Sequence, residues 1–526
     1  MKQKLLIIFT LLAIPCGMAA ATFYISPTGN DANNGQTQKT AFATLKAAQA
    51  LVEPGDTVLI LDGTYQVTEE EIMNEENKGT TGQYKIVFDM AKSGEVGRPI
   101  CYIGITDKEG NRPVFDLSQV KPTDWRVTGF LVSGKYLIFK NFEVVGIQVN
   151  RTDHTQSENF RITNGCYNTF ENIACHDGMG IGFYLNKHSA YNLFVNCDGY
   201  NNYDPVSDIN EKTKMGSGGN NDAFGCHVLA DCPNNIFIGC RAWNNADDGY
   251  DLISCASVAT FCYSIAYKNG YDAENVSRGD GNGFKAGGYG MSTTSAVNDV
   301  TMDNVPMHEV YHCIAASNKS NGIYSNHHLG GVYFHDNTAY HNSRYNYNLV
   351  NRKGVAIEDA VDVNGYKHKL ERNLSIVDNG KDNHVTYLRG DEGDNTLKDN
   401  SFYWDNHGYG GWAYTVYGNS IFESTTLSNL LVARDADGML SEQTLNAMKL
   451  KTDIGKGASF DGYRQAIEEM RKKSGAETDG GTTAIQSIRQ VTPHKGDKAI
   501  YDLQGRQVTN LRKGIYIQNG QKIVIR

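Results

Sequence analysis

The chain has 526 residues, of which 40% are apolar and 21% charged, with 55 glycines against only 10 prolines. This balance is typical of a globular protein and excludes a disordered chain, a collagen and a bundle of membrane helices. The net charge of −10 argues against nucleic acid as a partner, because phosphate binding requires basic surface. An anionic ligand would need local basic residues or a bound cation to offset the repulsion.

The N-terminus has the pattern of a secretory signal peptide. Two lysines precede an apolar run from Leu5 to Ile14, and three alanines end at Ala21. We therefore expect residues 1–21 to be removed and the protein to be exported, to the periplasm or as a secreted or cell-surface protein. The apolar run is too short to span a membrane. Lipid attachment at Cys16 is the weaker alternative, because Ile-Pro precedes it where small residues are preferred.

The mature chain opens with a strand, a helix and a second strand. Residues 22–35 read TFYISPTGNDANNG, residues 40–52 form the amphipathic stretch TAFATLKAAQALV, and residues 54–65 read PGDTVLILDGTY. A helix placed before a long β array is expected to cap its end.

From residue 136 onward, short apolar runs recur, each followed by a polar turn rich in Asn and Gly. When they are aligned, one repeat position is occupied by Ile173, Cys197, Cys240, Ser264, Cys313, Asn337, Asn373 and Asn400. The basic spacing is about 24 residues, and longer intervals contain insertions, which repeat proteins accept as loops on one face. The pattern predicts an all-β protein, a right-handed parallel β-helix in which each coil buries its apolar face against its neighbours.

The cysteines do not form a metal-binding pattern. No CxxC pair and no Cys/His quartet is present, so zinc is not expected. Cys197, Cys240 and Cys313 share the repeat position, where we expect reduced interior thiols rather than disulfides.

The C-terminal part of the chain changes character. We expect the β-helix domain to fill residues 22–475, with its last coil near residue 440 and a helix over 459–475. Residues 476–483 read as a linker. Residues 484–526 form short alternating strands of a small β module. This module resembles the sorting or anchoring modules of exported bacterial enzymes, and a tail that only adds stability is the alternative.

Four coils superpose eight residues beyond the repeat position, once two insertions are allowed for. Their sequences are DAFG at 222, DGYD at 248, NGFK at 282 and NGIY at 321. Because neighbouring coils lie about 4.8 Å apart, Asp222 should stack on Asp248, and Asp251 should lie beneath Lys285. Asp247 adjoins them in the same turn.

Carboxylates gathered in this way repel one another unless a cation or shared protons relieve them. Oxygen ligands without His or Cys favour calcium over zinc. The alternative is that these aspartates only hydrogen-bond the backbone of their turns, as Asp and Asn often do.

Lys285 lies in the Gly-dense turn DGNGFKAGG, which allows a ligand to approach the backbone. A lysine normally titrates near pH 10.4, so a basic role requires desolvation or a nearby positive charge. Calcium supplies such a charge and also neutralises the carboxylate of a uronic acid. Removal of the C5 proton by Lys285, followed by departure of the C4 oxygen, is β-elimination. The alternative is that Lys285 only forms an ordinary salt bridge with an aspartate.

With the opening YISPTGNDANNG and PGDTVLILDGTY, the motifs NNDAFG, NNADDGYDLISC and GNGFKAGG resemble polysaccharide lyase family 9 over residues 22–475. This family comprises calcium-dependent pectate and rhamnogalacturonan lyases. The resemblance implies calcium ligands at Asp222, Asp247, Asp248 and Asp251 and a lysine base at Lys285. It also implies a galacturonate-containing substrate, and the chain looks closest to the members that act on rhamnogalacturonan I. We expect a monomer.

Further basic and aromatic residues lie around the predicted groove. Candidates for pairing with substrate carboxylates are Lys268, Arg278, Lys319, Arg344 and Arg352. Tyr324, His327 and His328 could stack on sugars or donate to the leaving oxygen. We expect His227 and His335 to be structural.

Two other functions fit the same pattern. An inverting glycoside hydrolase would use Asp222, Asp247 and Asp248 as acid and base carboxylates around a water, but it leaves Lys285 without a role. The other is a β-helix that binds polysaccharide or acts as an adhesin without catalysis.

Overall fold

The computed structural model describes residues 20–209, 216–289, 304–376, 385–390, 393–402 and 417–474, together with the backbone of 500–501, 514–518 and 521–525. Nearly all of the predicted signal peptide and the whole predicted linker lie outside the described residues. Within the described residues, no helix is both long and apolar enough to cross a bilayer.

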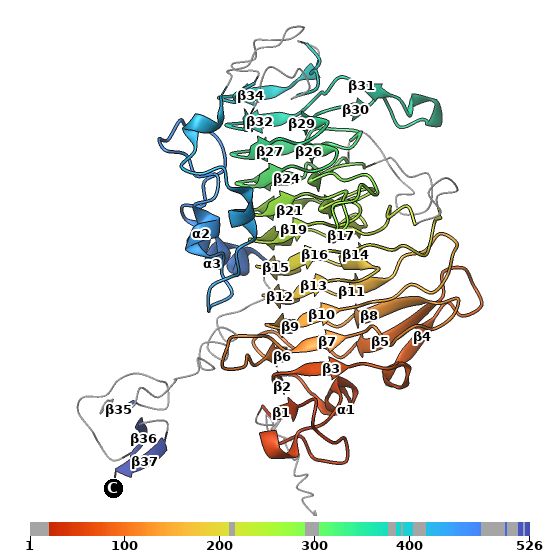
Figure 1. Ribbon diagram of the computed structural model, residues 1–526, viewed down its shortest axis with the longest axis vertical. Helices are drawn as coiled ribbons and strands as arrows, with labels where there is room; N and C mark the ends of the chain where they lie inside the picture. The colour runs from red at the N-terminus through yellow and green to blue at the C-terminus, as the bar shows by residue number, and fades with distance from the viewer. Residues whose placement is uncertain are drawn as a thin grey trace, which may run out of the picture.

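The chain coils into a parallel β-helix whose strands form three long sheets (Figure 1). Sheet I contains, in spatial order, β1 (Thr22–Ile25), β2 (Thr57–Ile60), β6 (Ile100–Gly104), β9 (Leu137–Lys140), β12 (Thr169–Glu171), β15 (Leu193–Val195), β18 (Asn235–Ile238), β21 (Ala259–Cys262), β24 (Glu309–Tyr311), β27 (Tyr333–His335), β32 (Lys369–Glu371) and β34 (Thr396–Lys398).

Sheet II contains β3 (Thr64–Gln66), β7 (Val114–Asp116), β10 (Glu143–Val145), β13 (Ala174–His176), β16 (Asp198–Tyr200), β19 (Arg241–Trp243), β22 (Ile265–Tyr267), β25 (Ile314–Ala316), β28 (Thr338–Tyr340) and β33 (Leu374–Ile376). Sheet III contains β4 (Asn74–Glu76), β5 (Tyr84–Met90), β8 (Arg126–Val132), β11 (Glu158–Thr163), β14 (Ile181–Lys187), β17 (Phe224–Val228), β20 (Tyr250–Asp251), β23 (Phe284–Lys285), β26 (Asn321–Tyr324) and β29 (Tyr345–Asn348). All neighbours in these sheets are parallel except β4, which is antiparallel to β5.

The remaining elements are short. They are η1 (Gln38–Thr40), α1 (Leu45–Leu51), η2 (Glu69–Glu71), the antiparallel pair β30 (Asn351–Arg352) and β31 (Asp362–Val363), η3 (Ile357–Asp359), η5 (Asn419–Ile421), η6 (Leu427–Leu431), α2 (Glu442–Leu445) and α3 (Tyr463–Ser474). In the predicted C-terminal module, β35 (Ile500–Tyr501), β36 (Gly514–Gln518) and β37 (Gln521–Ile525) form an antiparallel sheet.

Helix α1 closes the N-terminal end of the stack, as predicted. Its N-cap is Thr44, whose hydroxyl accepts a hydrogen bond from the Ala47 N–H at 3.2 Å. Leu45 and Ala48 are fully or almost fully buried and belong to the same hydrophobic cluster as the β-helix interior. The helix therefore covers apolar side chains of the first coils that no preceding coil covers.

The predicted repeat position is a hydrogen-bonded ladder between sheets I and II. The Cys240 N–H donates to the Ser264 hydroxyl at 3.2 Å, and the Cys313 N–H donates to Asn337 Oδ1 at 2.9 Å. Each side chain thus satisfies the backbone of the preceding coil, which explains why small polar residues recur there at the coil spacing.

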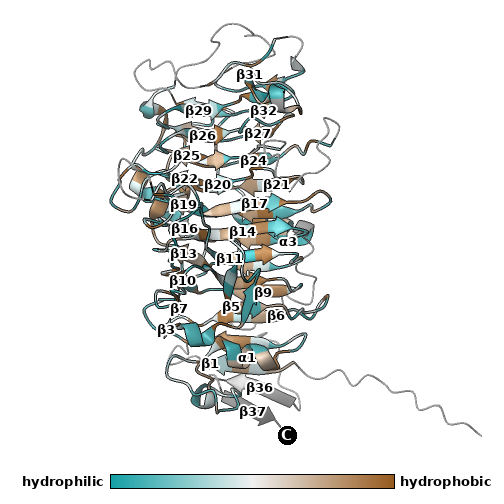
Figure 2. Ribbon diagram, turned by 90° about the vertical axis from the view of Figure 1, so that its right-hand side faces the viewer, coloured by the Kyte–Doolittle hydropathy of each residue, from teal (hydrophilic) through white to brown (hydrophobic). Residues whose placement is uncertain are grey.

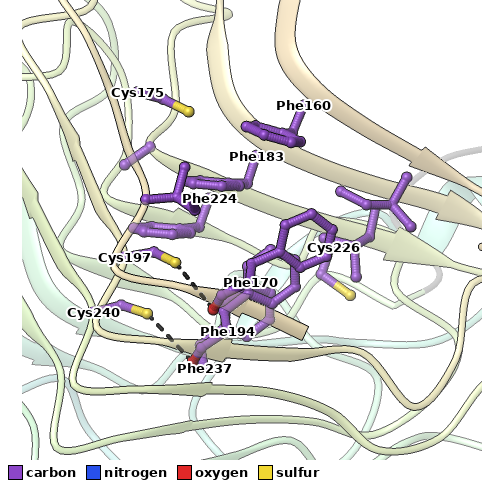
Figure 3. Close-up of a cluster of buried hydrophobic side chains, with 14 of the residues drawn as sticks. Phe160, Phe170, Cys175, Phe183, Phe194, Cys197, Phe224, Cys226, Phe237 and Cys240 are labelled. Atoms are coloured by element: carbon purple, nitrogen blue, oxygen red, sulfur yellow. Dashed lines mark hydrogen bonds between the residues drawn. The ribbon is translucent and has the colours of Figure 1, made fainter. Parts of the chain in front are cut away.

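The interior is filled by columns of stacked rings (Figure 3). Along sheet III, Phe183 stacks on Phe224 and Phe224 on Tyr250, with ring centroids 5.1 and 5.0 Å apart. Beside them, the buried thiols of Cys197 and Cys240 donate to backbone carbonyls of the sheet I column (Figure 3). These cysteines are interior thiols, as predicted.

The end of the β-helix differs from the prediction. The last described strand of the stack is β34, and the expectation of coils up to residue 440 is wrong. Residues 417–474 instead run along the outside of the stack, over sheets I and II (Figure 1). The predicted C-terminal helix is present as α3, whose Tyr463 and Ile467 pack on apolar residues of sheet I. We call residues 417–474 the strap.

Candidate active site

The candidate site lies on the outward face of sheet III, on the side of the stack seen in Figure 2. The strand register aligns five residues of consecutive coils in one outward row, which we call the central row. From the N-terminal side it contains Tyr184, Gly225, Asp251, Lys285 and Tyr324. The predicted placement of Asp251 next to Lys285 is therefore confirmed.

A second ladder runs beside the central row and confirms the superposition of the four coil motifs. The Asp248 N–H donates to Asp222 Oδ1 at 3.1 Å, and the Asn282 N–H donates to Asp248 Oδ1 at 2.6 Å. Asn321 Nδ2 in turn donates to Asn282 Oδ1 at 2.7 Å. Asp or Asn is needed at each step because the side-chain oxygen must accept from the next coil.

Three carboxylates converge between this ladder and the central row. Asp222, Asp248 and Asp251 each offer an oxygen, and these oxygens lie within 4.8 Å of one another. All three residues are at most 6% exposed. Asp247 is buried next to them, but it lies outside this triad, and its Oδ1 accepts the Asp280 N–H at 2.8 Å.

Among the residues that the structure describes, one cation faces this acidic cluster. Lys285 Nζ lies 3.1 Å from Asp248 Oδ2 and 3.2 Å from Asp251 Oδ2. Asp248 Oδ2 is buried and lies off the direction of a hydrogen bond from this ammonium, and no other described residue donates to it. One lysine thus compensates only part of the negative charge of Asp222, Asp247, Asp248 and Asp251.

The proton affinities reflect this imbalance. Burial, and then repulsion from the neighbouring aspartates, raises the pKa of Asp222 and of Asp247 well above the usual value. For Lys285, burial by itself would lower the pKa, but the surrounding aspartates outweigh it and raise the pKa well above its usual value. A convergent, oxygen-only donor set with excess negative charge is suited to a hard divalent cation.

Glycines allow neighbouring coils to approach closely at Lys285. A Cβ on Gly283 would lie 2.5 Å from the Gly322 carbonyl oxygen, and one on Gly287 would lie 2.0 Å from the Ser325 carbonyl oxygen. The turn that follows Lys285 is fixed by His328, whose Nδ1 accepts the N–H groups of Gly288 and Tyr289 at 3.2 Å.

The structure separates the predicted substrate-binding residues into two groups. His328 and Arg352 are buried, and their nitrogens bond to backbone groups. A polysaccharide cannot reach them, so the structure does not support a binding role. Arg344, in contrast, is exposed. Burial raises the pKa of Tyr324, and the positive charge of Arg344 offsets part of this rise.

Lys268, Arg278 and Lys319 gather at the corner between sheets II and III, around the loop that leads to Asp280. Arg278 forms an ion pair with Asp272 at 2.7 Å, and the Lys319 ammonium donates to the carbonyls of Arg278 and Gly279. Lys268 donates to Asn275 at 3.0 Å. In the structure these three side chains stabilise the loop beside Asp247.

Tyr324 and His327 lie together, and His327 also contacts Asp362, which the sequence did not indicate because it lies outside the coil repeat. Tyr184 was missed as well, although register places it next to Gly225 in the central row. His227 packs its ring edge-on against Tyr184 at 5.1 Å. His335 ends strand β27 of sheet I and contacts Asp336, so it does not belong to the sheet III face.

The comparisons with known proteins agree with this geometry. Residues 23–373 match the model of the Pel9A-like right-handed β-helix region. The chain belongs to this family. It is 33% identical to pectate lyase L of Dickeya dadantii (strain 3937), over 80% of this chain and 82% of that protein. Among solved structures, a rhamnogalacturonan lyase is 40% identical with a TM-score of 0.74, covering 84% of this chain and 100% of that one.

The structure of pectate lyase Pel9A is 28% identical, with a TM-score of 0.58, and covers 83% of this chain and 91% of that one. The β-helix is therefore right-handed, as predicted. With relatives of these names over most of its length, the chain is a polysaccharide lyase.

Proposed function

We propose that the protein cleaves a pectic backbone, rhamnogalacturonan I in preference to polygalacturonate, by calcium-assisted β-elimination. The observation that carries this proposal is the position of Lys285, within 3.2 Å of two buried aspartates of a cluster that it does not neutralise. The preference for rhamnogalacturonan is supported by the 40% identity to a rhamnogalacturonan lyase whose whole length the chain covers.

Asp222, Asp248 and Asp251 would hold calcium, with Asp247 beside them. When bound, the ion neutralises these carboxylates and the carboxylate of a uronate, which acidifies the proton at C5. With the aspartates neutralised, Lys285 no longer holds its own proton so strongly. Its neutral amine, in the row next to the carboxylate site, can then take the C5 proton. The C5–H bond breaks, the C4–C5 double bond forms and the C4–O bond breaks, so no nucleophilic water is required.

Arg344 is the basic residue best placed to bind a further uronate. It is exposed at the start of β29, on the far side of Lys285 from the acidic cluster. A guanidinium there can pair with a carboxylate of the polymer.

We further propose that residues 1–21 are a signal peptide and that the protein acts after export. We also propose that it acts as a monomer. The antiparallel strands β35 to β37 fall in the C-terminal module of residues 484–526, for which sorting or anchoring is the proposed role.

The experiment is incubation with rhamnogalacturonan I and, separately, polygalacturonate, each with calcium and with a chelator. We expect an unsaturated product absorbing in the ultraviolet, faster from rhamnogalacturonan I and absent with chelator. Reducing ends without this absorbance would indicate a glycoside hydrolase instead. Binding of either polymer without any product would indicate a non-catalytic β-helix.

A further inference from the structure

Tyr324 occupies the position next to Lys285 in the central row, on the side away from the acidic cluster. The two residues are paired in register on adjacent strands, β23 and β26. The Tyr324 hydroxyl lies 2.5 Å from His327 Nε2, and His327 Nδ1 is hydrogen-bonded to an oxygen of Asp362. A carboxylate, an imidazole and a phenol thus form a hydrogen-bonded chain that ends beside the proposed base.

The backbone conformation before His327 allows these hydrogen bonds to form. Asn326 and His327 both have positive φ, +50° and +54°, which returns His327 towards Tyr324 three residues earlier. Asp362 comes from another segment, because β31 pairs with β30 in the excursion that follows β29.

The hydrogen-bonded chain of Tyr324, His327 and Asp362 leads from the buried face to solvent. Tyr324 is 8% exposed, the His327 side chain 27% and the Asp362 side chain 56%. A proton taken up by His327 from water can therefore pass to the phenol without crossing the apolar interior. The carboxylate of Asp362 orients the imidazole, as in other base–orienter pairs.

We propose that Tyr324, recharged by His327 and Asp362, donates the proton that the leaving oxygen requires. This inference rests on the proposed function. The order acidic cluster, Lys285, Tyr324 along the central row matches the order carboxylate, C5, C4–O along the sugar. A uronate bound with its carboxylate at the cluster would place C5 at Lys285 and the scissile bond towards Tyr324.

The atoms and charges balance. The electrons of the C5–H bond form the C4–C5 double bond, and those of the C4–O bond move to the leaving oxygen, which takes the Tyr324 proton. Tyr324 recovers a proton from His327, and His327 recovers one from water. Lys285 returns the C5 proton to water, so each turnover takes up one proton and releases one.

The test uses the full-length protein and two substrates that differ in their need for an acid. One is the pectic polymer, and the other is a uronide with fluoride at C4, which leaves without protonation. Tyr324→Phe should lose about 10²–10⁴-fold in kcat on the polymer and keep wild-type elimination of fluoride. Lys285→Ala should lose both activities. Tyr167→Phe, in a ring stack on the outside of the helix, is the matched control that should lose neither.

His327→Ala provides the second test. It should also lose turnover on the polymer, and added imidazole should restore it, with calcium affinity unchanged by calorimetry. If Tyr324→Phe folds poorly, His327→Gln is compared on the same two substrates. Equal losses on polymer and fluoride, or no loss on either, would overturn this inference. If the wild-type protein forms no unsaturated product from either substrate, the proposed function itself fails, which is a separate outcome.

Discussion

Two places on this molecule bury charged side chains, and they are compensated differently. Under the strap, Asp198 accepts hydrogen bonds from Arg241 at 2.8 and 3.0 Å and also pairs with Arg434, and all three side chains are at most 6% exposed. Burial alone would raise the pKa of Asp198, but the two guanidiniums hold it far below its usual value.

On sheet III the balance is reversed, because four aspartates share one lysine. The strap cluster is complete within the chain, whereas the sheet III cluster has negative charge that the described residues do not neutralise. A buried charge that its own chain satisfies is structural, while one that is left unsatisfied indicates a missing ligand.

The largest expected effect is on catalysis. Lys285→Ala should lower turnover by about 10²–10⁴-fold, the usual contribution of a general base. Calcium affinity should not fall, since a competing ammonium has been removed. Turnover is measured from the ultraviolet absorbance of the product, and Lys398→Ala, an exposed lysine of β34, is the control. Retained activity in Lys285→Ala would refute the assignment of the base.

Breaking the compensated cluster should damage stability instead. Asp198→Asn leaves two buried guanidiniums without their carboxylate and should cost about 3–5 kcal/mol in the free energy of unfolding. Urea unfolding measures the loss. Turnover of the folded protein, measured at low temperature, should stay at the wild-type value, because the strap lies over sheets I and II. A fall in turnover without a fall in stability would contradict the comparison.

Acid should destabilise the protein through the buried imidazoles near the site. His328 and His368 are almost fully buried and accept backbone N–H groups, and burial lowers the pKa of each from 6.5 to about 4. The unfolded state therefore binds protons first, and stability falls as the pH drops from 6.5 to 4. Each histidine should contribute about 3 kcal/mol. His368→Gln should make the pH dependence of urea unfolding shallower, and an unchanged slope would argue against neutral burial.

The smallest expected effect is a gain in stability. Asp222→Asn keeps an oxygen that can accept the Asp248 N–H and removes one repelling charge. It should stabilise the calcium-free protein by about 1–2 kcal/mol, measured by urea unfolding with chelator at pH 8. A loss of stability would mean that the cluster is balanced as it stands.

The coil architecture could be predicted because residues at equivalent positions of the coils recur at a regular spacing in the sequence. The ladder through Cys240 and Ser264 and the register of Asp251 with Lys285 both follow from spacing alone. The calcium role of the four aspartates and the basic role of Lys285 stay predictions, supported by the geometry.

Apart from Tyr184, what the sequence missed lies outside the repeat. Asp362 reaches His327 through the excursion that contains β30 and β31, which lies outside the coil repeat, and the strap carries no coil signal at all. His328 and Arg352 looked available for substrate because turn residues are usually exposed, but here both are buried and bonded to backbone groups.

Calorimetric titration with calcium tests the central claim most directly. The wild-type protein and Asp198→Asn should each bind one ion, whereas Asp222→Asn should bind none or bind far more weakly. Binding of calcium to all three proteins with the same affinity, or to none of them, would contradict the view that the uncompensated cluster on sheet III is the metal site.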